Sequence, residues 1–397
     1  MNQADTGPDA PMASAAPNEV RNVGPMRVST IELFFDLVFV FTITQLTRML
    51  EHDPTATGLL RAVLALGVIW WMYGGYAWLT NAVALDRTTR RLHLLTGMAG
   101  YLVMALALPG AFAGDGVAFG LGYLVVTVTH TVLFTRARSR DSVHGILRIA
   151  PTNVGAALLV LGAGFLDGPA VLALWSGAFL LAFAGPFLGG GLSRFVVRPA
   201  HFVERHGLVM LIVLGESIVA IGIGAAGHRV DAPLVGAAVL GLALTACLWW
   251  FYFSGDDERA ERALSAAPGS RRSLLALLAY GYAHIPLILG VVALAAGVTE
   301  TLAHPFAHAH PEWAVALGGG AALYLAGDVV FRRILGVSGG GWRVAAAVVA
   351  LATIPLGVVT TAIGQLAALV AVLVTALITE HRVGGRQKAG RVAPPHP

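Results

Sequence analysis

Ionisable side chains interrupt apolar parts of this sequence at only a few positions. The stretch HFVERHGLVMLIVLGESIVAIG, residues 201–222, carries Glu204 and Arg205 near its start, and Glu216 and Ser217 within a long apolar run. A carboxylate in a membrane helix is costly, and such groups usually face the bundle interior or a water-filled cavity. Glu216 is about ten residues, or about 15 Å, from either end of its expected helix, which predicts a position at the membrane midplane. Arg205 shares that helix face but is about 16 Å away.

A second pair of acidic residues lies in ELFFDLVFVFTITQLT, residues 32–47. Glu32 and Asp36 are four residues apart, so they are neighbours on one helix face. Carboxylates inside a membrane helix can relay protons or mark an ion pathway. A structural role stays open as well. Glu32 and Glu204 suit helix N-termini, where a carboxylate complements the helix dipole, and Asp36 suits a structural ion pair.

Two further polar residues lie beside prolines inside apolar segments. Asn153 follows Pro151, and His284 precedes Pro286. Proline removes a backbone hydrogen bond from a helix, and a broken helix at membrane depth is tolerated where other groups pair with the freed backbone or where it lines a cavity. These breaks predict either a polar site or only a bend, and a packing role stays open for His284.

The patterns of common enzyme sites are absent from the sequence. It contains no Walker-type phosphate loop, no HExxH helix and no GxSxG elbow. The single cysteine, Cys247, excludes disulfides within the chain and cysteine metal sites. Three histidines between 304 and 310 have donors that zinc accepts, but Pro305 and Pro311 predict an irregular loop without fixed geometry. We therefore expect no catalytic residues, no metal and no cofactor.

The composition places these residues in a membrane protein. Of 397 residues, 56% are hydrophobic and 12% are charged, and the mean hydropathy is +0.74; soluble chains have about a quarter of their residues charged. A helix needs about 20 mostly apolar residues to cross the hydrocarbon core. The sequence therefore predicts an all-α polytopic membrane helix bundle with twelve transmembrane helices. The helices are expected over 31–50, 58–80, 92–112, 116–135, 144–166, 169–190, 206–226, 233–253, 272–296, 312–333, 342–361 and 363–380.

The last two segments allow more than one arrangement. Only Gly364 and Gln365 provide a turn between them, and Pro355 predicts a kink in the eleventh segment. Two separate spans, one broken helix and a re-entrant pair all stay open.

The loops predict the orientation of the chain. Arginines cluster in alternate loops, as in DRTTRR at 86–91 and RARSR at 136–140, and the other loops hold few. Arginine-rich loops stay in the cytoplasm, which places both termini there. Because the basic residues form no single patch, we expect no nucleic-acid partner. Residues 1–27 lack the apolar core of a signal peptide and are expected to form a disordered tail, and 381–397 form a basic tail.

An internal repeat is visible in the first three spans of each half. IWWMY at 69–73 matches LWWFY at 248–252, and these four tryptophans are half of the eight present. RRLHLLTGMAGY, from 90, aligns without gaps to RRSLLALLAYGY, from 271, and residues 32–47 lie opposite 204–219. Six spans separate the copies, so both halves have the same orientation, which predicts a 6+6 parallel repeat about an axis along the membrane normal. The repeats are expected over 28–190 and 191–380.

Two of the quoted stretches resemble a known family. ELFFDLVFVFTITQLT, preceded by Arg27, and HFVERHGLVMLIVLGESIVAIG are similar to the two signatures of the bacterial low temperature requirement protein A family. The resemblance covers residues from about 27 to 380 and implies a multi-pass protein of the bacterial inner membrane that is linked to growth in the cold. It supplies neither a substrate nor catalytic residues. FFDLVFVFTIT is also similar to the first-span signature of the tandem six-span potassium channels of lysosomes and bacteria, which have serine where this chain has Phe35.

The sequence supports two hypotheses of function. In the first, the chain is a transporter or channel for protons, cations or a small solute, with the lipid bilayer and that ion or solute as its partners. In the second, it is a non-transport scaffold or a lipid-associated cold-adaptation factor whose carboxylates lock helices together. Association of two chains stays open. The residues predicted to line a polar path are Glu216, Ser217, Asp36, Glu32, Asn153, His284, Glu204 and Arg205.

Overall fold

The computed structural model describes residues 28–392 apart from 84–86, 138, 189, 191–194 and 339. The predicted disordered tail over 1–27 lies outside the described residues, as do the last five residues of the basic tail. Within the described part every regular element is a helix. Twelve helices there are long and apolar enough to cross a membrane, and each matches one predicted segment. The predicted all-α membrane bundle is therefore confirmed.

The helices of the first half begin at capping residues. Glu32 Oε2 accepts hydrogen bonds from the backbone N and Oγ of Ser29, at 2.8 and 2.7 Å, and Thr55 and Ser139 accept from the first turns of α2 and α5. Such caps satisfy backbone N–H groups that have no partner inside the helix. The elements of this half are α1 (Thr30–His52), α2 (Ala56–Ala82), α3 (Thr88–Ala107), η1 (Leu108–Gly110), α4 (Gly116–Phe134), α5 (Arg140–Ala163) and α6 (Pro169–Leu188).

The second half contains more interruptions than the first. Proline stands in the first turns of α7, α8 and α12, where its missing N–H costs nothing. The elements of this half are α7 (Pro199–Gly224), α8 (Ala232–Phe253), α9 (Asp256–Ala266), α10 (Gly269–Ala276), η3 (Leu277–Tyr282), α11 (His284–Ala303), α12 (Pro311–Ile334), α13 (Gly341–Ala352), α14 (Ile354–Val359) and α15 (Ala362–Val392).

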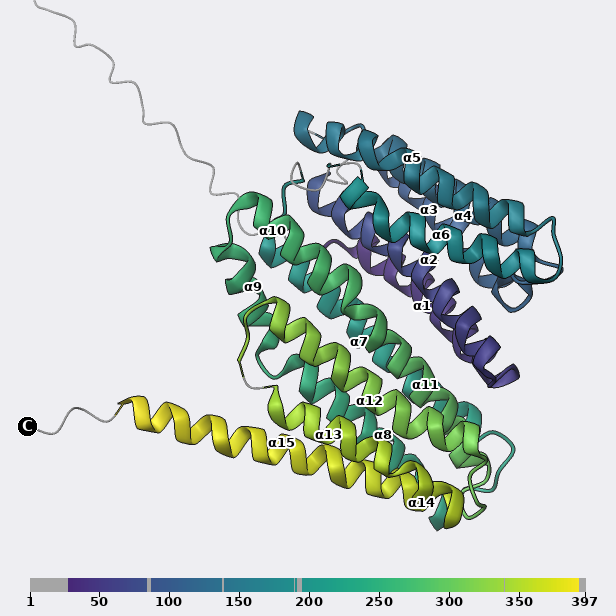
Figure 1. Ribbon diagram of the computed structural model, residues 1–397, viewed down its shortest axis with the longest axis vertical. Coiled ribbons are helices and arrows are strands. Elements are labelled where there is room, and N and C mark those ends of the chain that lie inside the picture. Colours follow the sequence, from purple (N-terminus) through teal and green to yellow (C-terminus); the bar gives the residue numbers. More distant parts are fainter. Residues whose placement is uncertain are drawn as a thin grey trace, which may run out of the picture.

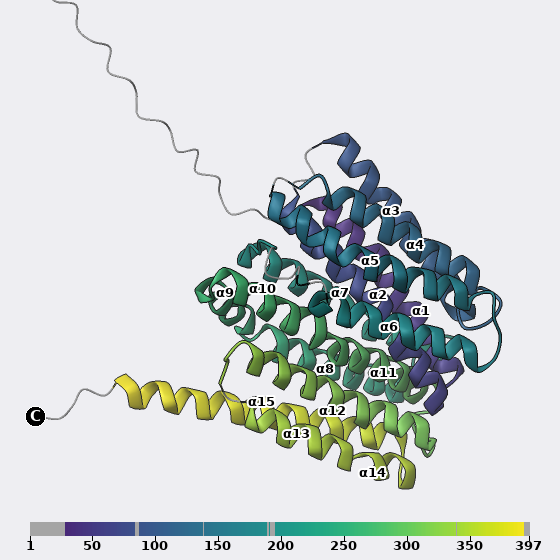
Figure 2. The same cartoon turned by 45° about the horizontal axis from the view of Figure 1, so that its top comes forward.

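The two halves lie side by side (Figures 1 and 2). In each half the first helix packs on the second and third, and the third, fourth, fifth and sixth pack in chain order. The second helix also packs on the fourth and sixth. These relations hold for α1–α6 and for α7, α8, α11, α12, α13–α14 and α15. The halves meet mainly where α1 and α2 contact α7 and α11.

A close glycine crossing also occurs in both halves. Gly100 of α3 faces Gly122 of α4, and Gly290 of α11 faces Gly320 of α12. A Cβ atom placed on Gly290 would lie 2.7 Å from the Gly320 carbonyl oxygen, so only glycine allows this approach. Small residues permit such contacts between membrane helices. The gap-free alignment pairs Gly100 with Gly281, whereas the structure gives Gly290 the corresponding place.

Replacement of Gly290 with alanine is expected to destabilise the chain by about 1–3 kcal/mol, because the added methyl group overpacks the crossing. Gly319→Ala is the matched control on α12, since its methyl group would meet only the Val315 side chain at 3.6 Å. Unfolding can be followed by maleimide labelling of Cys247, the single cysteine, which is buried. Equal melting of the two variants would contradict the tight crossing.

Three features of the second half either differ from the predicted helices or settle a point that the prediction left open. Residues 256–266, expected to be loop, form α9, which leaves α8 through Gly255 with a φ of 86°; only glycine adopts this conformation without strain. The eleventh span breaks at Thr353, just before Pro355, as the kink prediction required. After that span, α15 is a separate helix that lies beside α13 and runs to Val392 (Figure 1).

Candidate functional site

The candidate site lies where α1 of the first half packs against α7 of the second. Glu32 and Asp36 from α1 meet His201 and Arg205 from α7, and each of these side chains is at most 4% exposed. Charged groups are buried in proteins almost only when they are paired. The contact between the halves is therefore also a site of ion pairing.

Arg205 links the two carboxylates of α1. Its Nη1 lies 3.3 Å from Glu32 Oε1, and its Nη2 donates to Asp36 Oδ1 at 3.0 Å. The hydroxyl of Tyr73, on α2, donates to the same Asp36 oxygen at 3.0 Å. Nε2 of His201 lies 3.2 Å from Glu32 Oε1. This inter-half cluster, comprising Glu32, Asp36, Tyr73, His201 and Arg205, ties α1, α2 and α7 together.

The cluster also holds buried polar atoms whose hydrogen bonds are incomplete. Asp36 Oδ2 and Nε of Arg205 have no hydrogen-bond partner among the described residues, whereas Glu32 Oε1 and Arg205 Nη1 are held by the ion-pair contacts given above. Buried polar atoms in proteins are normally paired with other groups, ordered water or an ion. Two carboxylates thus share one guanidinium and one imidazole inside the bundle.

Glu32 has a second, structural role as the N-terminal cap of α1. The same side chain therefore supports the first turn of α1 and takes part in the ion pairing between the halves. Glu204 is exposed on α7 and takes no part in the inter-half cluster. The N-terminal turns of α7 are held by Asn81 of α2, which donates to the carbonyl of Arg198 at 3.0 Å and contacts His201 Nδ1 at 3.3 Å.

Glu216 lies apart from the inter-half cluster, towards the other end of α7. It is seventeen residues after Pro199 and eight before Gly224. Because α7 begins earlier than predicted, Glu216 does not lie at the centre of the helix. Glu216 is 2% exposed, and its Oε2 accepts a hydrogen bond from Thr44 of α1 at 2.7 Å. Its neighbour Ser217 is also buried, and its hydroxyl has no hydrogen-bond partner among the described residues.

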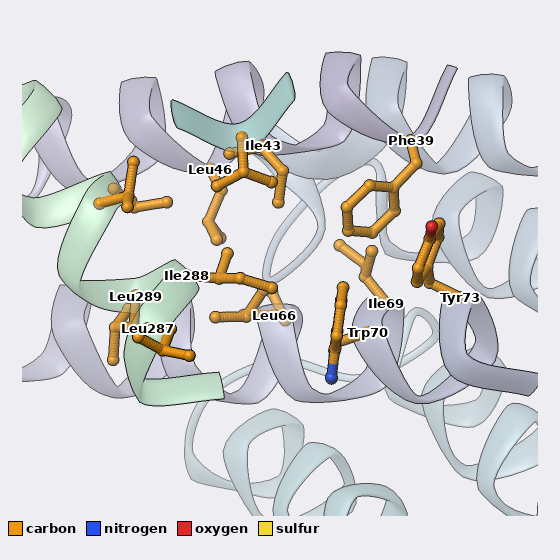
Figure 3. Close-up of a cluster of buried hydrophobic side chains, with 14 of the residues drawn as sticks. Phe39, Ile43, Leu46, Leu66, Ile69, Trp70, Tyr73, Leu287, Ile288 and Leu289 are labelled. Carbon is orange, nitrogen blue, oxygen red and sulfur yellow. The ribbon is translucent and has the colours of Figure 1, made fainter. Parts of the chain in front are cut away.

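An apolar layer separates the inter-half cluster from Glu216. It contains Phe39 and Ile43 of α1, Leu66 and Ile69 of α2 and Ile288 of α11, each at most 1% exposed. Figure 3 shows the side chains of these three helices meeting in this layer. Apolar constrictions exclude water and ions from a pore. On α1, Phe39 and Ile43 thus lie between Asp36, which pairs with Arg205, and Thr44, which contacts Glu216.

The break predicted at Pro286 takes the form of a π-helix, η3, directly before α11. Proline lacks the N–H that would continue the regular ladder, and π-turns occur frequently at functional sites. Trp70 of α2 donates its Nε1–H towards the carbonyl oxygens of Tyr280 and Gly281, at 3.2 and 3.1 Å. The π-helix therefore supplies backbone acceptors to the contact between the halves.

His284 is held by partners on both ring nitrogens. Nδ1 donates to the carbonyl of Ala279 at 2.8 Å, and Nε2 accepts from the hydroxyl of Tyr252 at 2.9 Å. The ring is fully buried and stacks on Trp70, with 5.9 Å between ring centres. Its contacts support the packing role that the sequence left open for His284.

Asn153 lies in a third place, inside the first half. Its Oδ1 accepts a hydrogen bond from Trp71 Nε1 at 3.0 Å, and α5 continues through Pro151. Together with Trp70 and His206, Asn153 lines a cavity of about 70 Å³. The predicted path residues are thus distributed over the inter-half cluster, the Glu216 level, this cavity and one exposed position.

A second buried charge cluster lies within the second half, and the sequence analysis missed it. Arg343 of α13 pairs with Asp328 of α12, lies 3.3 Å from Asp256 Oδ2 and lies 2.9 Å from Glu380 Oε2. Arg332 lies 2.9 Å from the same Asp256 oxygen. Asp256, Asp328 and Arg343 are each 1% exposed. This C-terminal charge cluster joins α9, α12, α13 and α15.

The three histidines between 304 and 310 line one pocket together with Glu300. His304 Nε2 lies 3.9 Å from Glu300 Oε1, and both side chains are partly exposed. Within the described part of the chain, no three His, Cys, Asp or Glu side chains are placed to hold one metal ion.

Comparison with known proteins gives the same family as the quoted stretches. The family model described as bacterial low temperature requirement A protein matches residues 27–378. The chain is also 29% identical over 324 residues to an uncharacterized protein of Rhizobium meliloti (strain 1021), and the match covers 79% of each chain. The matched range includes all twelve apolar helices except the last residues of α15. The chain therefore belongs to the bacterial low temperature requirement A family of membrane proteins.

Proposed function

We propose that this chain is a transport protein of the bacterial inner membrane that moves protons, other cations or a small solute between its two halves. The observation that carries the proposal is the inter-half cluster. Glu32, Asp36 and Arg205 are buried exactly where the halves meet, and their buried oxygen and nitrogen atoms are only partly hydrogen-bonded. Ionisable groups inside a membrane bundle commonly mark an ion pathway or a proton relay.

The arrangement of the halves supports the same proposal. We propose a 6+6 parallel repeat with both termini in the cytoplasm. Thr44 and Glu216 are aligned positions of that repeat, and they contact each other directly. Equivalent residues meet in this way close to the axis that relates two copies. In many transporters the site lies at the interface between repeats, and access alternates as one repeat rocks against the other.

The apolar layer fits a closed state of such a path. Phe39, Ile43 and Ile288 block passage between the inter-half cluster and Glu216. Relative movement of α1 and α7 would part this layer and also alter the pairing of Arg205 with the two carboxylates. A proton or cation bound by Asp36 would change the strength of that pairing, so binding and movement are coupled.

Glu216→Gln is expected to reduce ion flux to about the level of empty liposomes, because the amide keeps the shape and the Thr44 contact but loses the charge. Flux is measured in proteoliposomes under potassium, sodium and proton gradients. Glu204→Gln is the matched control, since Glu204 lies on the same helix but is exposed. Equal flux in wild type and Glu216→Gln would remove Glu216 from the path.

A scaffold role is the second candidate, and the C-terminal charge cluster favours it. There Arg343 of α13 pairs with carboxylates of α9, α12 and α15, all within the second half. Such contacts would hold these helices together and would not line a path between the halves. If wild-type protein that is folded carries no ion under any gradient, while neutralisation of Glu216 lowers its melting temperature, the carboxylates lock helices and the chain does not transport ions.

A further inference from the structure

The paired tryptophans of the two halves have different surroundings, although the motif is the same. Trp249 and Trp250 of α8 are 40% and 57% exposed, as expected for side chains that face lipid. Trp70 of α2 is 1% exposed, and Trp71 beside it is only partly exposed. Both Trp70 and Trp71 line the cavity that Asn153 also lines. The first half thus uses the motif to form the wall of a cavity.

This cavity, here called the tryptophan cavity, lies between the halves. Its walls come from α2, α4, α5 and α6 on one side and from α7 and η3 on the other. A volume of about 70 Å³ is several times what one water molecule requires. Trp78, Phe134 and Phe195 add further aromatic surface. None of the described lining residues is Asp, Glu, Lys or Arg, so the cavity suits an uncharged, flat and mainly apolar molecule.

Polar atoms at fixed positions in the wall define the rest of the ligand. Nε2 of His130 bonds to the Gly75 carbonyl at 3.0 Å, so Nε2 carries the proton. Nδ1 of His130 is then an acceptor, but this atom is fully buried and presents no surface to the cavity. His206 Nδ1 bonds to the Phe202 carbonyl at 2.8 Å, which makes its Nε2 a second acceptor.

We infer that the tryptophan cavity binds a small neutral aromatic molecule with one O–H or N–H donor, of the phenol or indole type. The aromatic walls stack on the ring, and His206 Nε2 accepts the hydrogen bond from the ligand. The amide nitrogen of Asn153 is available to a ligand oxygen, because Oδ1 is the atom that accepts from Trp71. This inference requires only binding, and it holds whether or not the chain moves ions.

The test uses para-fluorophenol as the probe and fluorobenzene as its partner without a donor. Each is titrated by fluorine NMR into nanodiscs of phosphatidylethanolamine and phosphatidylglycerol that contain the full chain. We expect saturable, protein-dependent binding of para-fluorophenol. Fluorobenzene should bind about five- to tenfold more weakly, the ratio expected for one lost hydrogen bond. If para-fluorophenol only partitions into the lipid and its binding does not saturate, the inference is overturned.

Gly74 provides a variant that fills the cavity without strain. It lines the cavity, and a Cβ atom placed on it meets nothing within 4 Å. Gly74→Leu should therefore lower affinity for para-fluorophenol about tenfold or more, because the leucine occupies the ligand volume. Gly236→Leu is the matched control, since Gly236 also has open space around it but lies on α8 outside the cavity. Unchanged affinity in Gly74→Leu would overturn the site.

His206→Leu tests the hydrogen bond separately from the volume. The variant should bind para-fluorophenol and fluorobenzene with nearly equal affinity, because the only difference between the probes is the hydrogen bond to His206 Nε2. A retained preference for the phenol would exclude His206 as the acceptor and overturn this part of the inference. Melting followed at Cys247 establishes that each variant is folded before it is titrated.

Discussion

Replacement of Arg343 with methionine is expected to destabilise the chain by about 3–5 kcal/mol, since one partner of a buried ionic network is removed and the others stay charged. Arg343 faces Asp256, Asp328 and Glu380, of which the first two are 1% exposed. Methionine keeps the volume and the flexibility of the side chain but not its charge. Asp328 would then lose its closest cation, and Asp256 would lose one of the cations that pair with it.

The measurement is thermal unfolding in nanodiscs, followed by maleimide labelling of Cys247 on α8, the helix that packs against α15. A change of this size lowers the melting temperature by roughly 10 °C. Arg333→Met is the matched control, because Arg333 lies at the same end of α12 as Arg332 but is exposed. A melting temperature within error of wild type would mean that the C-terminal charge cluster contributes little to stability.

Much of the fold could be predicted from the sequence, because a membrane helix is recognised by its length and its apolar composition. Each of the twelve predicted segments corresponds to one apolar span, and even the kink at Pro355 and the break beside Pro286 follow from the missing N–H of proline. Helix ends were less certain, as α7 shows. Its first turn begins at Pro199, a favoured first position of a helix, whereas the prediction began where the apolar run begins.

The sequence analysis missed the short helix α9, because a search for long apolar segments does not detect a polar helix. Its signal was nevertheless present. Asp256, Asp257 and Glu258 occupy the first turn, where acids complement the helix dipole, and the buried residues Ala260 and Leu264 are four apart. A search for amphipathic helices would have found the element, although not the burial of Asp256.

The candidate residues were found one at a time, but their grouping was not predictable. Asp36 and Arg205 are 169 positions apart in the chain, and helix periodicity relates only residues of one helix. The sequence placed Arg205 and Glu216 on one face of α7, and the structure gives them different partners on α1, Asp36 for one and Thr44 for the other. Which helices become neighbours decides such pairs, and a single sequence does not contain that information.

Arg205→Met is expected to have the second large effect, about 3–5 kcal/mol, because Glu32 and Asp36 would remain buried without their shared cation. The guanidinium also packs over the rings of Phe35 and Tyr73, at 5.7 Å from each centre, and methionine retains part of this contact. The loss is therefore mainly electrostatic. Melting followed at Cys247 measures it, with Glu204→Gln as the exposed control on the same helix.

The triple variant Glu32→Gln, Asp36→Asn, Arg205→Met separates stability from function at this site. With every charge removed, no carboxylate is left unpaired, so most of the lost stability should return. The remaining deficit should reflect the cap of α1, which a glutamine at position 32 still forms in part. If the triple variant is stable but its proteoliposomes carry no flux, the charges themselves serve transport. If it is stable and flux equals wild type, the inter-half cluster is a lock between the halves, and the path for the ion or solute lies elsewhere.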